Sequence, residues 1–219
     1  MSSSAVAVPH TPRIALIAVL TVVCAFVAWF LAKKWMVYFH YDAVSYEELW
    51  PRRFVFLPHL VGGSVAAITG LIQIWLGMTG RTRALHRLLG RVYLGGIAIG
   101  SAAAFGLAFT TISPDTLSYR AGLFMLSVAW IVTTTMAYVA VRRRNIEQHR
   151  EWMLRSYTVT FAFVSFRIAA QWLIALGVPD GPDLQGALAW GCWAIPLLLA
   201  EPLIQLRRLR LDARRRVLH

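Results

Sequence analysis

Long apolar runs separated by short polar segments fill most of the chain. Six of these runs are long enough to cross a lipid bilayer, and they cover residues 14–32, 54–78, 92–112, 121–141, 153–177 and 187–206. A membrane-spanning helix needs about 20 mostly apolar residues, because each residue advances the helix by about 1.5 Å. The pattern predicts an all-α, polytopic membrane protein whose six transmembrane helices form one bundle, a single membrane domain over residues 1–219.

The first apolar run is predicted to be a retained membrane anchor. It is longer than the apolar region of a typical signal peptide. Lys33, Lys34 and Trp35 follow it, where small residues would mark a cleavage site.

Composition supports the membrane assignment and narrows the partners. The chain is 58% hydrophobic and 15% charged, whereas a soluble domain carries about a quarter charged residues. Its net charge of +12 would suit a nucleic-acid-binding protein. The sequence has no zinc-finger spacing, RNA-binding signature or leucine heptad, however, so we expect no nucleic-acid partner. Cys24 and Cys192 lie in apolar runs and are interpreted as small buried residues rather than a disulfide or redox pair.

The basic residues predict the orientation of the helices. Of the 22 Lys and Arg residues, sixteen lie on flanks that face the cytoplasm if the N-terminus does, and five lie on the opposite flanks. Cytoplasmic loops of membrane proteins are enriched in Lys and Arg. We therefore expect both termini on the cytoplasmic side of the membrane, with anionic lipids as counter-charges at the cytoplasmic face.

The first outer loop is rich in aromatic residues. They are Trp35, Tyr38, Phe39, Tyr41, Tyr46 and Trp50. Because Trp and Tyr prefer the membrane interface, we interpret the loop as a segment on the outer surface. The alternative is a lid over an outward-facing cavity.

Two inner segments share a short motif that predicts an internal repeat. One contains His86-Arg87, Arg91 and Tyr93, and the other contains His149-Arg150, Arg155 and Tyr157. In both, a Tyr follows the second Arg by two residues, and each segment precedes an outward-going helix. The repeat candidates are residues 54–112 and 121–177, related by an axis along the membrane normal. Such an axis places the two histidines at equal depth on the inner side.

The second apolar run carries small and polar residues on one helical face. They are His59, Gly63, Ala66, Gly70, Gln73 and Gly77. Together with Gly62, the small residues are typical of close helix packing. Because packing explains neither His59 nor Gln73, the face is also a candidate site for a flat cofactor or a quinone.

The fifth apolar run contains Arg167 near its middle. A central Arg costs about 2.5–3.5 kcal/mol on insertion scales, and no acidic residue lies at its depth. We expect Arg167 to face the bundle interior and to bind an anionic group, with Thr160 and Gln171 on the same helical face. Near the inner end of the sixth run, Glu201 is expected to form a structural ion pair with Arg155 or Arg91.

The histidines divide into an outer and an inner pair. His40 and His59 lie toward the outer side, and His86 and His149 toward the inner side. A neutral imidazole ligates haem iron, so His86 and His149 are candidate haem ligands. The alternative is a pair of interfacial histidines bonded to carbonyl or phosphate groups.

Three stretches resemble a bacterial family of predicted membrane proteins, domain of unknown function 2306. The stretches are LPHLVGGSVAAITGLIQ, LHRLLGRVYL and QHREWMLRSYTVTFAFVSFR. The resemblance covers the second to fifth helices and implies that the positions to test first are His59, Gln73, His86, Arg91, His149, Arg155 and Arg167. More distantly, the chain is similar to membrane b-type cytochromes, but it departs from them because no single helix bears two haem-ligating histidines.

Three functions fit these residues. The favoured one is a haem- or quinone-linked membrane redox protein that uses His59, Gln73, His86, His149, Arg167 and Gln171. The alternatives are a transporter or sensor for a small anionic solute and a non-catalytic membrane assembly factor. A second membrane protein or a second copy of the chain is a candidate partner. We assign no catalytic residues, and the sequence lacks nucleotide-binding and nucleophile motifs.

Overall fold

The computed structural model describes residues 11–79, 82–110 and 117–217. Its elements are α1 (Thr11–Tyr38), α2 (Ala43–Tyr46), the 3-10 helix η1 (Glu47–Arg52), α3 (Arg53–Thr79), α4 (Arg83–Thr110), α5 (Leu117–Arg142), α6 (Ile146–Ala175) and α7 (Pro182–Val217). Within these described ranges, six helices are long and apolar enough to cross a membrane, which confirms the predicted all-α class and the predicted six spans.

The helices extend further than the apolar runs predicted. The expectation that the repeated motif precedes each outward-going helix is wrong, because α4 begins at Arg83 and α6 at Ile146, so both motifs lie on these helices. Asn145 caps α6 by accepting a 3.0 Å hydrogen bond from the backbone N–H of Gln148, which allows the helix to start before the apolar run. The basic tail is also helical, because α7 continues to Val217.

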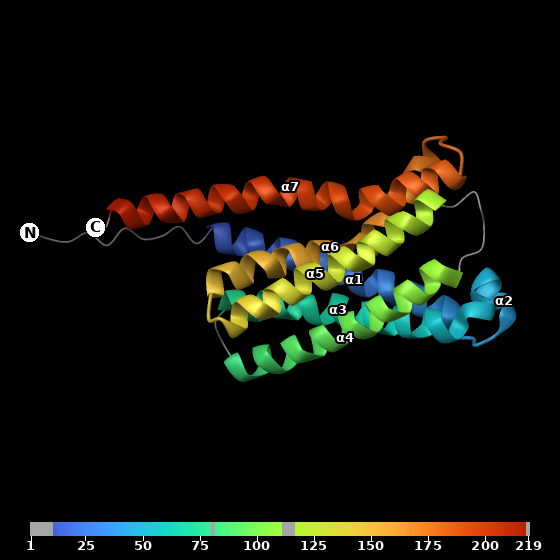
Figure 1. Ribbon diagram of the computed structural model, residues 1–219, viewed down its shortest axis with the longest axis horizontal. Helices are drawn as coiled ribbons and strands as arrows, with labels where there is room; N and C mark the ends of the chain where they lie inside the picture. The colour runs from blue at the N-terminus through green and yellow to red at the C-terminus, as the bar shows by residue number, and fades with distance from the viewer. Residues whose placement is uncertain (1–10, 80–81, 111–116, 218–219) are drawn as a thin grey trace, which may run out of the picture.

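Four helices form the centre of the bundle, and two others pack outside it. α3 packs along α4 and α5 along α6, while α4 and α5 join these two hairpins (Figure 1). α7 lies against α5 and α6, and α1 contacts α3 and α6 through an apolar cluster that includes Phe30, Leu71 and Val164. Within the central four, α4 and α6 stand diagonally opposite each other.

Glycines allow α3 and α4 to touch through their backbones. A Cβ atom added to Gly62 would lie 2.6 Å from the backbone nitrogen of Gly100 and 2.6 Å from the carbonyl oxygen of Gly96. The interpretation of close helix packing is therefore confirmed at Gly62. A Cβ atom added to neighbouring Gly63 would meet nothing within 4 Å, so this glycine serves no such contact.

The aromatic segment folds into a small cap on α1 and α3. The buried ring of Tyr46 contacts the rings of Tyr38, Tyr41, Trp50 and Phe56. The segment is ordered by its own rings and by the Asp42 cap, and its role as an interfacial segment or a lid stays a prediction. Asp42 accepts a 2.7 Å hydrogen bond from the Ser45 N–H, which holds the pKa of this exposed carboxyl below its usual value.

The cysteines differ in their surroundings. Cys192, on α7, is buried against α5 and α6, as expected. Cys24 is exposed on α1, so the prediction that both cysteines are buried is wrong. An apolar run in a membrane protein has a lipid-facing side as well as a core-facing side, and the sequence alone does not separate them. Both cysteines are free thiols.

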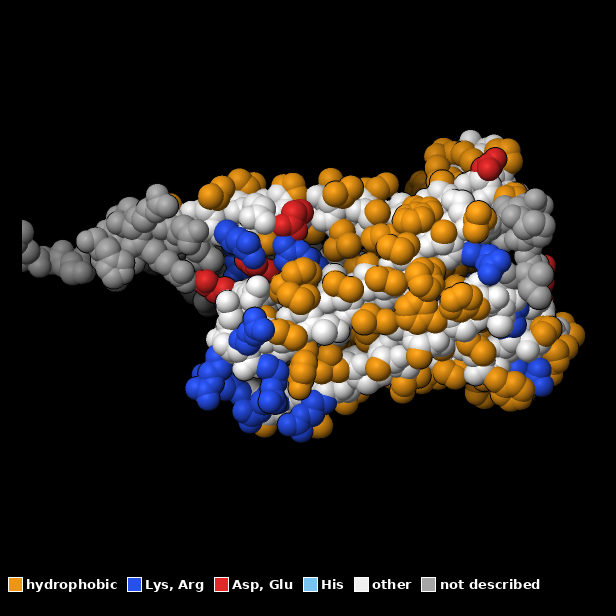
Figure 2. Space-filling model, viewed as in Figure 1, with side chains coloured by type: hydrophobic (Ala, Val, Ile, Leu, Met, Phe, Trp, Pro, Cys, Tyr) orange, Lys and Arg blue, Asp and Glu red, His pale blue; other side chains and the backbone are white. Residues whose placement is uncertain are grey.

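The two ends of the bundle differ in charge. Lys and Arg side chains gather where α4 and α6 begin, at the left of Figure 2, and we call this the basic end. Exposed arginines there include Arg83, Arg87, Arg91, Arg142, Arg143, Arg144 and Arg150. The opposite end, where η1 lies and α3 and α5 begin, is called the aromatic end.

We predict that the basic end faces the cytoplasm, because Lys and Arg concentrate on that side of membrane proteins. Reporter fusions at Asp115, Pro179 and His219 measure this directly. The first two should be active only as periplasmic reporters, and the third only as a cytoplasmic one. A C-terminal fusion that reports from the periplasm contradicts the predicted orientation.

Candidate functional site

The two histidines of the repeated motif occupy the first turns of α4 and α6. His149 Nδ1 lies 2.9 Å from the carbonyl oxygen of Ala137 on α5. Because a carbonyl only accepts, the Nδ1 position carries the proton, and the lone pair of Nε2 remains available to a ligand. Proteins usually orient a ligating imidazole in this way, through a hydrogen bond from the ring nitrogen that does not bind the ligand.

His86 lies in the first turn of α4, on the same end of the bundle as His149. Its Nδ1 atom is buried, and the described residues offer it no hydrogen-bond partner. The Gln73 amide donates a 2.5 Å hydrogen bond to the His86 carbonyl oxygen, which ties α3 to the first turn of α4. The basic end therefore holds two imidazoles in the first turns of α4 and α6, one oriented by the backbone and one with an unsatisfied buried nitrogen.

A buried hydroxyl network joins α4, α5 and α6 further along the bundle axis. Tyr93 Oη lies 2.8 Å from Ser156 Oγ and 3.0 Å from Thr160 Oγ1. Trp130 donates a 2.8 Å hydrogen bond to Thr160, and Thr134 Oγ1 lies 2.6 Å from Ser156 Oγ. All five side chains are buried, so the network crosses the centre of the bundle without water-facing members.

One arrangement of protons satisfies every donor in this network. Thr160 donates to the Ser156 carbonyl oxygen, so the Thr160 hydroxyl must accept from both Trp130 and Tyr93. Ser156 then donates to Tyr93, and Thr134 donates to Ser156. A fully satisfied buried network stabilises one packing arrangement, since an unpaired polar group there is costly. We therefore assign the network a structural role.

The network fixes the register of α4 against α6. His86 precedes Tyr93 by seven residues, and His149 precedes Ser156 by seven residues. Seven residues are about two helical turns, or about 10 Å along each helix. Both histidines thus lie about two turns from a shared hydrogen bond, on the same side of it. The superposition of the two hairpins as a repeat stays a prediction.

The tyrosines of the repeated motif meet at α3. A Cβ atom at Gly70 would clash with the ring of Tyr157 and would lie 3.2 Å from the Tyr93 ring. Tyr157 Oη donates a 3.3 Å hydrogen bond to the Ala67 carbonyl oxygen. Because Gly70 has no side chain, the rings of Tyr93 and Tyr157, one from each hairpin, can both pack against α3 at this residue.

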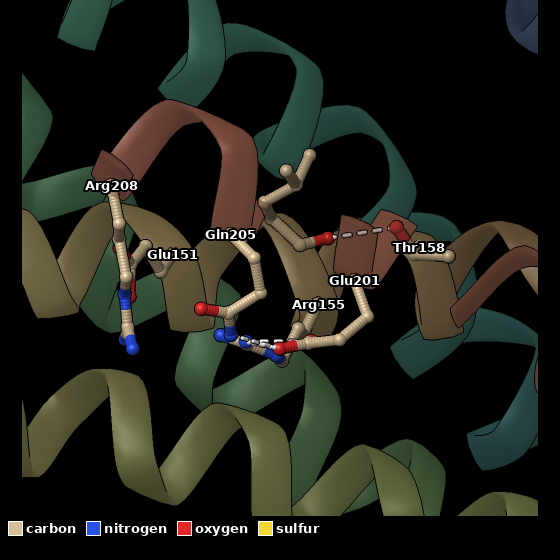
Figure 3. A network of polar contacts seen from close by, with 7 residues as sticks. Glu151, Arg155, Thr158, Glu201, Gln205 and Arg208 are labelled. Atoms are coloured by element: carbon tan, nitrogen blue, oxygen red, sulfur yellow. Dashed lines mark hydrogen bonds and ion pairs between the residues drawn. The ribbon is translucent and has the colours of Figure 1, made fainter. Parts of the chain in front are cut away.

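Ion pairs connect α6 to α7 near the basic end (Figure 3). Arg155 donates two hydrogen bonds to Glu201 Oε2, at 3.0 Å from Nε and 2.7 Å from Nη2. Gln205 donates a 2.7 Å hydrogen bond to the same carboxylate, and Arg208 pairs with the buried Glu151. The expected ion pair of Glu201 is confirmed, and its partner is Arg155, whereas Arg91 is exposed on α4.

His59 lies toward the aromatic end of α3. Its Nδ1 atom is 3.0 Å from the carbonyl oxygen of Gly100, and its ring is edge-on to Phe163 of α6 at 6.5 Å. The carbonyl again places the proton on Nδ1 and leaves the Nε2 lone pair as an acceptor.

Arg167 and Gln171 lie on the part of α6 nearest the aromatic end, and both side chains are exposed. The Arg167 guanidinium lies 5.8 Å from the centre of the Phe166 ring. The expectation that Arg167 is enclosed in the bundle interior is therefore wrong, because the helices do not close around it.

The candidate residues thus form two groups. Gln73, His86 and His149 lie toward the basic end, whereas His59, Arg167 and Gln171 lie toward the aromatic end. Three members of the hydroxyl network were not singled out from the sequence, namely Tyr93 as a partner of α6, Trp130 and Thr134. The Tyr that the two motifs share could have drawn attention to Tyr93, but it does not identify the residues to which Tyr93 bonds. No comparable pattern marks Trp130 or Thr134.

A bundle of six candidate spans with buried polar side chains at its centre defines a multi-pass membrane protein. The chain belongs to the family of predicted membrane proteins called DUF2306, which matches residues 56–204. No curated protein and no solved structure matches the chain. The family match covers α3 to α6 and most of α7, including both histidine motifs.

Proposed function

We propose that this chain is a membrane redox protein that holds a haem b, or a quinone in its place, beside His86 and His149. The observation that carries the proposal is the matched placement of these two imidazoles in the first turns of α4 and α6, each seven residues before the hydrogen bond between Tyr93 and Ser156. Imidazole pairs from facing helices are a common way to hold haem iron in a membrane bundle. When bound, a haem supplies a one-electron carrier.

The surrounding residues fit such a group. The Ala137 carbonyl orients His149 so that Nε2 is the ligating atom. Arg87 and Arg150 directly follow the two histidines, are exposed, and supply positive charge for the propionates of a haem. Among the described residues no cluster of three His, Cys, Asp or Glu side chains occurs, so the donors at the basic end are a pair and not a zinc-type set.

The proposal is tested by the absorption spectrum of the full chain purified from membranes. We expect a Soret band, and α-band changes on reduction with dithionite. His86→Ala and His149→Ala should each abolish or shift the spectrum, because each removes one axial ligand. His59→Ala is the matched control and should leave the spectrum unchanged.

The alternative that the protein binds a quinone is tested with the same purified protein. A protein without a Soret band should yield co-purified quinone on organic extraction, and less of it in both variants of the histidine pair. A protein that carries neither group contradicts the redox proposal and leaves the two alternatives, a transporter or sensor of a small anionic solute and a membrane assembly factor.

A further inference from the structure

The two imidazoles of the proposed haem site are held in different ways. His149 Nδ1 bonds to the Ala137 carbonyl oxygen at 2.9 Å, and this acceptor belongs to the backbone of α5, so no rotation of a side chain can remove it. His86 Nδ1 is buried, and the residues that the structure describes give it no hydrogen-bond partner. Because a buried polar atom without a partner is costly, the His86 ring is the less firmly held of the two.

Helix α3 holds the backbone of His86 rather than its ring. The Gln73 amide donates its 2.5 Å hydrogen bond to the His86 backbone carbonyl oxygen. A Cβ atom added to Gly77 would lie 3.8 Å from His86 Cε1, the ring carbon between the two nitrogens. At this place α3 therefore faces the ring with a residue that has no side chain to bond to it. The first turn of α4 is tied to α3, and the imidazole that it carries is not.

This difference sets the relative strength of the two imidazoles as metal ligands. A ligating imidazole usually donates its second ring N–H to a carbonyl or carboxylate group, which raises its basicity and fixes its orientation. Loss of such a partner typically weakens metal binding by about 10- to 100-fold. His149 has this partner, and His86 has none among the described residues, so His86 is the weaker ligand.

We propose that His86 is an exchangeable haem ligand, and that a small neutral diatomic molecule takes its place while His149 stays bound. This inference rests on the proposed haem site and adds ligand binding to electron transfer. The exchange breaks one coordinate bond, forms another and transfers no electron. The His86 ring is half-buried, and its chain neighbours Leu85 and Arg87 are exposed, so the ring can turn toward the polar side when it is released. Steric access to the iron decides whether such a molecule binds.

The test uses the full chain purified from membranes and reduced with dithionite, with carbon monoxide as the probe. We expect carbon monoxide to shift the Soret band, because two firmly held imidazoles would leave it no position on the iron. His86→Ala should keep its haem and bind carbon monoxide about 10- to 100-fold more tightly, whereas His149→Ala should lose its haem. Equal loss of haem in the two variants, or an unmodified chain that does not respond to carbon monoxide, overturns the inference.

A matched pair of substitutions on α3 tests the missing hydrogen bond directly. Gly77→Ser brings a hydroxyl acceptor to the ring edge, whereas Gly77→Ala adds the same Cβ atom without the hydroxyl. That Cβ atom makes an ordinary van der Waals contact with His86, so both variants should fold. Carbon monoxide should bind about tenfold more weakly to Gly77→Ser than to Gly77→Ala, since an anchored imidazole is harder to displace. Equal affinities would contradict the role given to the unpartnered nitrogen.

The outcomes separate this inference from the redox function. A chain without a Soret band overturns the haem site and the exchange together, while the extraction of quinone still decides the redox function. A chain whose Soret band changes on reduction but not with carbon monoxide keeps the redox function and overturns only the exchange.

Discussion

Replacing Gly62 with alanine is expected to lower the free energy of unfolding by about 2–3 kcal/mol, near the upper end for overpacked positions. A Cβ atom there lies 2.6 Å from backbone atoms of Gly96 and Gly100, and backbone cannot rotate away as a side chain can. Helices α3 and α4 must therefore move apart along their closest contact. Unfolding in mixed detergent micelles, followed by circular dichroism, measures the loss.

Gly63 provides the matched control. The substitution is the same and the residue is adjacent, but the new Cβ atom meets nothing within 4 Å. Gly63→Ala should be neutral or stabilising by up to about 1 kcal/mol, since alanine favours the helix more than glycine does. Equal stability of the two variants would show that α3 and α4 are not in backbone contact in the membrane.

Replacing Glu201 with leucine is expected to destabilise the protein by about 2 kcal/mol. Arg155 would keep its charge in a place where only 12% of its side chain is exposed, and removal of one partner of a buried pair typically costs about 3–5 kcal/mol. We expect less than that range because the Glu201 side chain is 42% exposed. The same unfolding measurement gives the value.

A double variant separates the stranded charge from lost packing. Arg155→Met with Glu201→Leu removes both charges at similar volume and should recover most of the stability. Both variants also remove the Glu201 carboxylate that accepts a hydrogen bond from Gln205. The second ion pair between α6 and α7, Arg208 with Glu151, keeps both of its partners. If the double variant is as unstable as Glu201→Leu alone, the unpaired arginine is not the cause.

The sequence by itself determined the class of protein and the number of spans. Apolar length decides whether a helix crosses a bilayer, and this property is local to each run. It also identified Glu201 as an ion-pair former, because a carboxylate near the end of an apolar run, close to several arginines, has few other partners. The charge asymmetry between the ends was likewise readable from loop composition.

Tertiary structure decided which faces of the helices meet. Gly62 and Gly63 are identical in sequence terms, yet one touches backbone and the other open space, because only the crossing of α3 with α4 distinguishes them. Arg167 was expected in the bundle interior together with Thr160, but Thr160 is buried and Arg167 is exposed, because burial depends on which helices pack beside each turn of α6. Tyr93 found its partners on α6 because contacts across the bundle depend on register and separation between helices, which periodicity along one helix does not encode.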